Sequence, residues 1–137
     1  MKELLTKTPE LLLLSGIIAM VFVFIKEKWV SNQPVGNDKM RIIANNIADG
    51  AMSFLKAEYK ILFFFVLIVG SLLTYVGSTQ DSGPLLGFSF LVGAICSGLA
   101  GFIGMKVATK ANVRTTNAAQ DSLGKALSVA FAGGSVM

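Results

Sequence analysis

Long uncharged stretches separated by short charged segments dominate this chain of 137 residues. Residues 11–25 are almost wholly apolar, residues 61–77 contain no charge, and residues 85–105 form a third uncharged run. A helix needs about 20 mostly apolar residues to cross the roughly 30 Å hydrocarbon core of a bilayer. The pattern therefore predicts complete transmembrane helices over about residues 9–29, 60–78 and 84–107.

The first of these segments is the shortest. Leu4 and Leu5 precede it and Trp29 follows it, with Lys26 and Lys28 close by. Lysine stems reach to the membrane surface and tryptophan favours the interface, so these residues extend the usable length. A cleaved signal peptide is the alternative, but no small-residue cleavage site follows the apolar core. We therefore expect an uncleaved first span.

A fourth apolar segment follows Lys125 and contains only residues 126–137. Twelve helical residues cover about 18 Å, little more than half of the hydrocarbon core. If Met137 were a true C-terminus, its α-carboxylate would lie near mid-bilayer, at a cost on the order of 2.5–3.5 kcal/mol on insertion scales. The last four helix carbonyls would also be unpaired. The pattern predicts a truncated span over about residues 122–137 in a fragment of a longer protein. An in-frame stop after codon 137 of the source gene would contradict this.

The charged segment between the first two spans predicts an amphipathic cytoplasmic helix over about residues 38–58, capped by Asn37 or Asp38. Its apolar positions share one face at helical spacing: Ile42, Ile43, Ile47, Ala51, Phe54 and Leu55. Such a face suits a helix that lies along the membrane surface and leads into the second span through Glu58.

Lysine and arginine set the expected orientation. Six of them lie in residues 26–60 and four follow the third span, whereas the N-terminus has two and residues 78–84 have none. Cytoplasmic loops carry the excess of positive charge, so the N-terminus and the turn at residues 78–84 are expected outside. The basic residues flank apolar runs and form no single stripe, which excludes a nucleic-acid partner. An integral membrane protein is expected.

Small residues recur along the third predicted span. Residues four apart share one side of a helix, and lipid tails are as apolar as leucine, so close approach through small residues is what holds membrane helices together. We expect this helix to pack against a neighbour, and we favour packing over a ligand-binding role. The packing positions are Ser89, Gly93, Ser97 and Gly101, which we name the small-residue row, together with Gly104 in a second row with Ala100 and Ala108.

Three motifs carry a family resemblance. Residues 101–115 read G-x-x-G-M-x-x-A-x-x-A-N-V-R-T, residues 124–137 read G-K-A-L-x-V-A-F-x-x-G-x-V-M, and residues 47–59 read I-x-x-G-A-x-x-F-L-x-x-E-Y. They resemble the early region of the membrane-integral, ion-pumping pyrophosphatases, and the match is long and ungapped. The resemblance implies an all-α, polytopic bundle in a sixteen-helix homodimer. Its first four helices belong to an outer ring, and six inner helices from later in the chain carry the Mg-diphosphate site and the ion gate.

The resemblance also implies a pump that couples hydrolysis of diphosphate to transport of H⁺ or Na⁺, with Mg²⁺ and in some members K⁺ as cofactors, in the membrane of a prokaryotic cell. The residues present argue that the chemistry lies elsewhere. A pump needs an ionisable group within the bilayer, and the three complete spans have none. Diphosphate hydrolysis needs clustered carboxylates for Mg²⁺, and no D-x-x-x-D motif occurs. We therefore expect no catalytic residue, no cofactor and no metal in this chain.

The basic segment after the third span is expected to be a cytoplasmic loop, with structural roles for Lys110, Asn112, Arg114 and Thr115. Lys106, Lys110 and Arg114 are the candidates for steering an anionic substrate, but topology-setting charge and loop hydrogen bonds are favoured. Replacing Arg114 should therefore impair assembly more than substrate affinity.

Two further function classes remain open at this point. A rotor proteolipid of an ATP synthase would have a glycine-rich span joined to a basic loop, as this chain does. It also needs a carboxyl group midway along a helix, and none is present in the predicted spans. A small non-enzymatic adaptor would assemble through the small-residue row. Composition adds that the single cysteine, Cys96, excludes an internal disulfide, and that the absence of histidine excludes the usual zinc sites.

Overall fold

The computed structural model describes the backbone of residues 2–79 and 85–137, and their side chains apart from those of residues 2–7 and 9. Helices account for all the regular structure in these residues, which confirms the all-α class. They are α1 (Lys2–Ser31), α2 (Asp38–Thr79), α3 (Leu85–Ala119) and α4 (Leu123–Gly134). The turn expected at residues 78–84 lies largely outside the described residues, as does Pro84.

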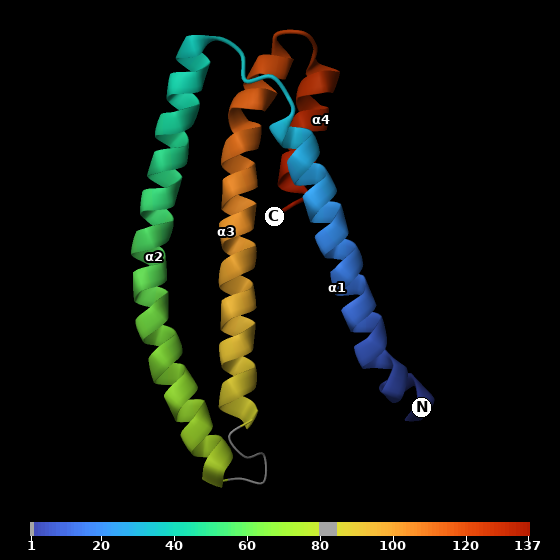
Figure 1. The fold of residues 1–137 in the computed structure, drawn as a ribbon, viewed down its shortest axis with the longest axis vertical. Coiled ribbons are helices and arrows are strands. Elements are labelled where there is room, and N and C mark those ends of the chain that lie inside the picture. The colour runs from blue at the N-terminus through green and yellow to red at the C-terminus, as the bar shows by residue number, and fades with distance from the viewer. Residues whose placement is uncertain (1, 80–84) are drawn as a thin grey trace.

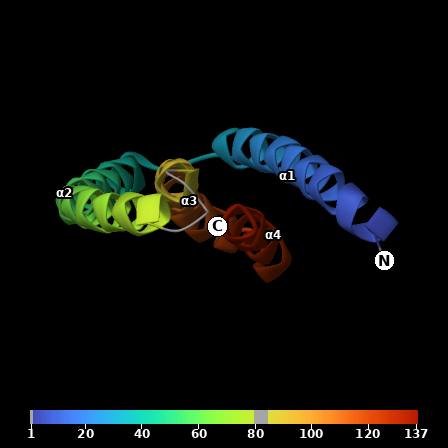
Figure 2. The ribbon, with the colours of Figure 1, turned by 90° about the horizontal axis from the view of Figure 1, so that it is seen from below.

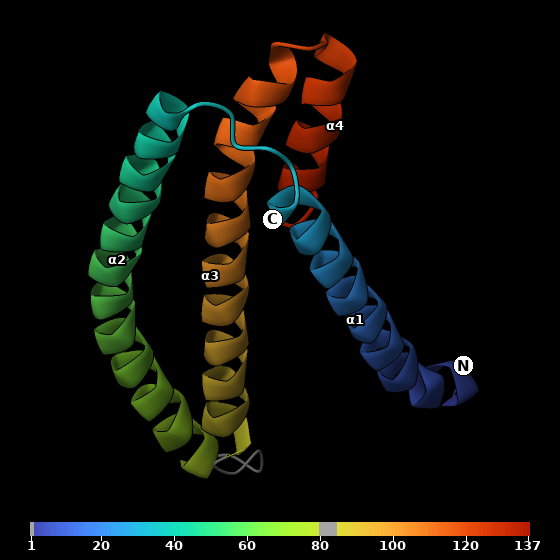
Figure 3. The same ribbon diagram turned by 45° about the horizontal axis from the view of Figure 1, so that its top comes forward.

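The helices α2 and α3 run antiparallel and side by side, and α4 packs against the C-terminal half of α3 (Figure 1). The helix α1 contacts only α3 and α4 among the described residues, near its C-terminal end, and diverges from them toward its N-terminus (Figures 2 and 3). The connections after α1 and after α3 lie at the same end of the bundle (Figure 1). That arrangement is the one the charge count requires, although the side of the membrane on which this end lies stays a prediction.

By length and composition, α2 and α3 are the two helices in the described residues that can cross a membrane, with mean hydropathies of 2.3 and 2.0 over their most apolar windows. They contain 42 and 35 residues, so they are about 63 and 52 Å long and extend well beyond a 30 Å hydrocarbon core. The first predicted span is helical, as expected. That it crosses the membrane, and that the chain has four spans, stay predictions.

The surface helix expected over residues 38–58 is not a separate element, because it forms the first half of the continuous helix α2. No proline interrupts this stretch and Gly50 is its single glycine, so nothing in it ends a helix. Asn37 provides the cap, since its Oδ1 accepts a 3.0 Å hydrogen bond from the N–H of Met40. That the first half of α2 lies along the membrane surface stays a prediction.

The loop expected from residue 108 onward is also wrong, because α3 continues to Ala119. Threonine and asparagine favour loops when their side chains compete with the helix for backbone groups. Here the Thr109 and Thr116 hydroxyls instead donate to carbonyls one turn earlier, at 3.0 and 3.1 Å. Only residues 120–122 connect α3 to α4, and the Ser122 side chain caps α4 by accepting from the N–H of Lys125.

The helices α2 and α3 approach closely where Gly87 of α3 faces Gly70 of α2. A methyl group on Gly87 would overlap the Thr74 hydroxyl and lie 3.2 Å from the Gly70 carbonyl oxygen. Nearer the other end of the contact, the Tyr59 hydroxyl donates a 2.5 Å hydrogen bond to the Gly98 carbonyl. Close backbone approach therefore brings these two helices together.

Most of the small-residue row lies outside this contact. Ser89, Gly93 and Ser97 are exposed, and a methyl group on Gly93 would meet nothing within 4 Å. At the end of the row, Gly101 lies near the Tyr59 hydroxyl, and Gly104 packs against Met137. Packing of a neighbour along the row stays a prediction.

The helices α3 and α4 approach most closely at Gly133, where an added methyl group would overlap the methyl of Ala111. Val30 from the end of α1 is fully buried beside them and forms a small core with Ala111 and Ala132. Small side chains on two helices thus leave room for one branched side chain from the third.

We expect Gly133→Ala to destabilise the full-length protein by about 1–3 kcal/mol, because the Ala111 methyl has no other rotamer and the helices must separate. The exchange variant Ala111→Gly/Gly133→Ala places one methyl back in the same space and should recover most of the loss. Thermal unfolding of the purified proteins in detergent measures both. Equal melting temperatures for Gly133→Ala and the exchange variant would contradict this packing.

Candidate functional site

The C-terminal end of α1 is the most densely hydrogen-bonded place in the described structure. The last four carbonyls of a helix have no partner within it. In α1, Asn32 and Gln33 satisfy the first three through hydrogen bonds of 3.1–3.3 Å. The fourth, that of Ser31, accepts a 3.1 Å hydrogen bond from Nη2 of Arg114 on α3. The following Pro34 cannot continue the helix, so the chain turns away here.

All three nitrogens of the Arg114 guanidinium are engaged. Besides Nη2, Nε donates to the Gln33 carbonyl at 3.0 Å and Nη1 donates to the Lys110 carbonyl at 2.8 Å. The negative end of the α1 dipole favours a cation at this position. Arg114 thus joins α3 to the last turn of α1 and to the residues that follow it.

One turn earlier on α3, Lys110 forms an ion pair with Glu27 of α1. The distance from Lys110 Nζ to Glu27 Oε1 is 2.7 Å, and both side chains are 34% exposed. The Ser31 hydroxyl completes the group, because it lies 3.2 Å from Nζ and donates to the same carboxylate oxygen at 3.2 Å. Water screens a pair this exposed, so it contributes about 0.2–1 kcal/mol and mainly fixes the register of the two helices.

Asn117 extends the same side of α3 by one more turn. Its Nδ2 donates a 3.3 Å hydrogen bond to the Pro34 carbonyl. Gly36 beside it has φ of 96°, and an added methyl group would lie 2.7 Å from Asn117 Oδ1. We name this set the polar clamp: Lys110, Arg114 and Asn117 of α3 with Glu27, Ser31, Gln33 and Pro34.

Of the four residues expected to have structural roles after the third span, the structure brings Lys110 and Arg114 into the clamp. Asn112 is exposed, and its carbonyl accepts from Thr116 within α3. Thr115 and Asn112 line an open hollow beside Gly133 and do not reach α1. The sequence analysis missed Asn117, although the spacing of 110, 114 and 117 places three polar side chains on one side of a helix.

The acidic side chains of the described residues do not fit a Mg²⁺ site. No three of the acidic residues or the cysteine lie close enough there to hold a metal. Two carboxylates pair with lysines instead, Glu27 with Lys110 and Asp121 with Lys125. Mg²⁺ takes several oxygen ligands in near-octahedral geometry, so no chemical step is assigned to these groups.

Comparison with known proteins supplies the wider context. The profile of the inorganic H⁺ pyrophosphatase family matches residues 17–137. A Clostridium tetani relative, provisionally named a K(+)-stimulated pyrophosphate-energized sodium pump, is 48% identical over 90% of this chain. A K(+)-insensitive pyrophosphate-energized proton pump of Methanosarcina mazei is 37% identical over 90%. A K(+)-stimulated pyrophosphate-energized sodium pump of Thermotoga maritima is 39% identical over 93%.

The chain spans about 17–18% of the length of these relatives. No solved structure matches it. The profile match covers most of the chain and includes the three motifs that carried the resemblance. It replaces the rotor proteolipid and the adaptor as interpretations. The chain belongs to the family of inorganic H⁺ pyrophosphatases.

Proposed function

We propose that the full-length protein is a pump that couples hydrolysis of diphosphate to transport of H⁺ or Na⁺, and that residues 1–137 supply scaffold helices without catalytic residues. The relatives' names support the activity, because they describe pyrophosphate-energized sodium and proton pumps. The polar clamp supports the scaffold role. Its charged side chains are already bound to neighbouring helices and carbonyls.

The three basic residues considered for substrate steering already make contacts within the described structure. Lys110 pairs with Glu27, and Arg114 binds three carbonyls. Lys106 lies 5.8 Å from the centre of the Phe102 ring, an arrangement that stabilises a cation over an aromatic face. Lys110 and Arg114 thus hold α3 to α1, whereas the contact of Lys106 lies within α3. Lys110 and Arg114 are therefore poorly placed to follow a diphosphate ion.

The remaining parts of the proposal come from the family resemblance and from the relatives. Mg²⁺ and diphosphate bind to segments beyond residue 137, two chains form a homodimer, and these helices belong to its outer ring. The relatives include both K(+)-stimulated and K(+)-insensitive pumps. K⁺ is a cofactor of the full-length protein if it belongs with the K(+)-stimulated pumps. The bilayer is the prokaryotic cell membrane, and the N-terminus lies outside.

The activity is tested with the full-length protein reconstituted into sealed vesicles. Addition of Mg²⁺ and diphosphate should release phosphate and drive uptake of either H⁺, read by a pH-sensitive dye, or ²²Na⁺. An ionophore for the transported ion should abolish uptake while hydrolysis continues. Hydrolysis without uptake of either ion would refute the pump.

Replacement of Arg114 tests the scaffold role. We expect Arg114→Ala to destabilise the full-length protein by roughly 2–4 kcal/mol, because three carbonyl oxygens lose a charged donor. The KM for diphosphate of the protein that remains folded should not change. The matched control is Arg41→Ala, since Arg41 is exposed on α2 and should tolerate the change. A raised KM in a stably folded Arg114→Ala protein would assign this residue to substrate binding instead.

Single cysteines test the orientation. In a background with the other reactive cysteines removed, including Cys96→Ala, a cysteine at Asn46 and one at Thr79 occupy opposite ends of α2. A membrane-impermeant thiol reagent added to intact cells should label Thr79→Cys and leave Asn46→Cys unmodified until the membrane is opened. Labelling of both from outside would overturn the predicted topology.

A further inference from the structure

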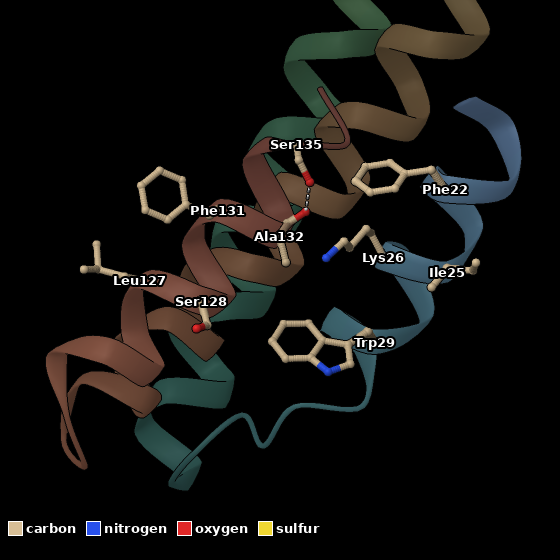
Figure 4. A pocket seen from close by; sticks show the side chains of 9 residues that line it. All are labelled: Phe22, Ile25, Lys26, Trp29, Leu127, Ser128, Phe131, Ala132 and Ser135. Carbon is tan, nitrogen blue, oxygen red and sulfur yellow. Dashed lines mark hydrogen bonds between the residues drawn. The ribbon is translucent and has the colours of Figure 1, made fainter. Parts of the chain in front are cut away.

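An open groove of about 670 Å³ lies between the C-terminal half of α1 and α4 (Figure 4). Its walls are mostly apolar, with Phe22 and Ile25 on α1 and Phe131 on α4. Lys26 and Trp29 also line it, and the Lys26 side chain projects from α1 into the space between the two helices (Figure 4). The groove thus places a cation over a largely apolar surface.

A second hollow of about 400 Å³ adjoins the groove, because Trp29 and Ser128 line both. Its walls mix apolar and polar side chains, and the charged ones are Arg114, Asp121 and Lys125. The two adjoining hollows, which we name the path, are mostly apolar between the helices and carry more charged groups near the connections at residues 32–37 and 120–122.

The path carries an excess of positive charge. Three cations line it, Lys26, Arg114 and Lys125, against the one carboxylate of Asp121. Asp121 pairs with Lys125 at 3.1 Å, and the clamp holds Arg114. Lys26 pairs with no carboxylate in the described part of the chain, and its Nζ lies 5.5 Å from the centre of the Phe22 ring. Charge complementarity here calls for an anion.

The position of the path along the helices narrows the choice of ligand. Tryptophan and lysine at the end of an apolar run mark the headgroup level of a bilayer. A free phosphate ion would leave the apolar groove empty, and an uncharged acyl chain would leave Lys26 without a counter-ion. A phospholipid with an anionic headgroup supplies both parts in one molecule, since basic groups near the membrane surface attract anionic lipids.

We propose that this path binds one anionic phospholipid per chain, of the phosphatidylglycerol type. One of its two acyl chains lies in the groove beside Phe22, and its phosphate lies near Lys26 and Lys125. The proposal requires that these helices lie in a membrane, but it does not require diphosphate hydrolysis. Its test therefore measures lipid binding alone.

The test uses the full-length protein in nanodiscs of phosphatidylcholine with a minor fraction of phosphatidylglycerol, and native mass spectrometry counts the lipid that each chain retains. Wild type should retain one phosphatidylglycerol per chain. Lys26→Gln should weaken retention roughly fivefold. Lys28→Gln is the matched control, because Lys28 is exposed on the same helix and does not line the path. Lys26→Arg should retain the lipid. Equal retention in Lys26→Gln and Lys28→Gln would overturn the proposal.

A second measurement separates a lipid from a later segment of the chain or a second copy. A fluorophore attached at Ser128→Cys should be quenched by phosphatidylglycerol with brominated acyl chains, and more strongly than by brominated phosphatidylcholine at the same fraction. Absence of quenching would mean that protein fills the groove and would refute the proposal. Loss of the lipid on addition of inorganic phosphate alone would identify an ion site instead and would refute it equally.

Discussion

The arrangement of α1 depends on a single junction, where its last turn meets α3 and α4. Val30 is fully buried there between Ala111 and Ala132, and the polar clamp lies directly beyond it. Apolar packing at this place excludes water from one side of the turn, and the Arg114 guanidinium satisfies the carbonyls on the other. Because α1 makes no other contact with the described helices, both parts of the junction are needed to fix its position.

The contacts of α3 with α2 and with α4 also depend on close approach and hydrogen bonding. The hydrophobic effect does not draw helices together within lipid, so backbones must approach closely or exchange hydrogen bonds. Gly87 against Gly70 provides the close approach between α2 and α3, and the Tyr59 hydroxyl provides a hydrogen bond to the Gly98 carbonyl. Gly133 against Ala111 repeats the first device between α3 and α4.

The sequence predicted the helices well because apolar runs and caps are local signals. Asn37, one of the two residues expected to cap the helix that begins near residue 38, does so. Helix ends were harder, since Thr109 and Thr116 bond within α3 and let it continue through a segment whose composition is typical of a loop. The contact partners of individual side chains were the hardest feature to predict from the sequence. Arg114 was expected to have a structural role, but two of its three acceptors lie more than 80 residues away in the sequence. The contact with α2 includes Gly87 and Gly98, which the sequence did not single out, while packing of a neighbour along the small-residue row stays a prediction.

The one-ended attachment of α1 affects how it responds to the bilayer. Its apolar residues from Leu11 to Ile25 are largely uncovered by the described helices, and the helix diverges from the bundle (Figure 3). A rod anchored at one end can change its inclination while the anchor stays intact. Tilting is one way in which a hydrophobic stretch adapts to membranes of different thickness. If α1 crosses the bilayer as predicted, it is the element among the described helices that can adjust to a thicker or thinner membrane while α2 and α3 keep their mutual register.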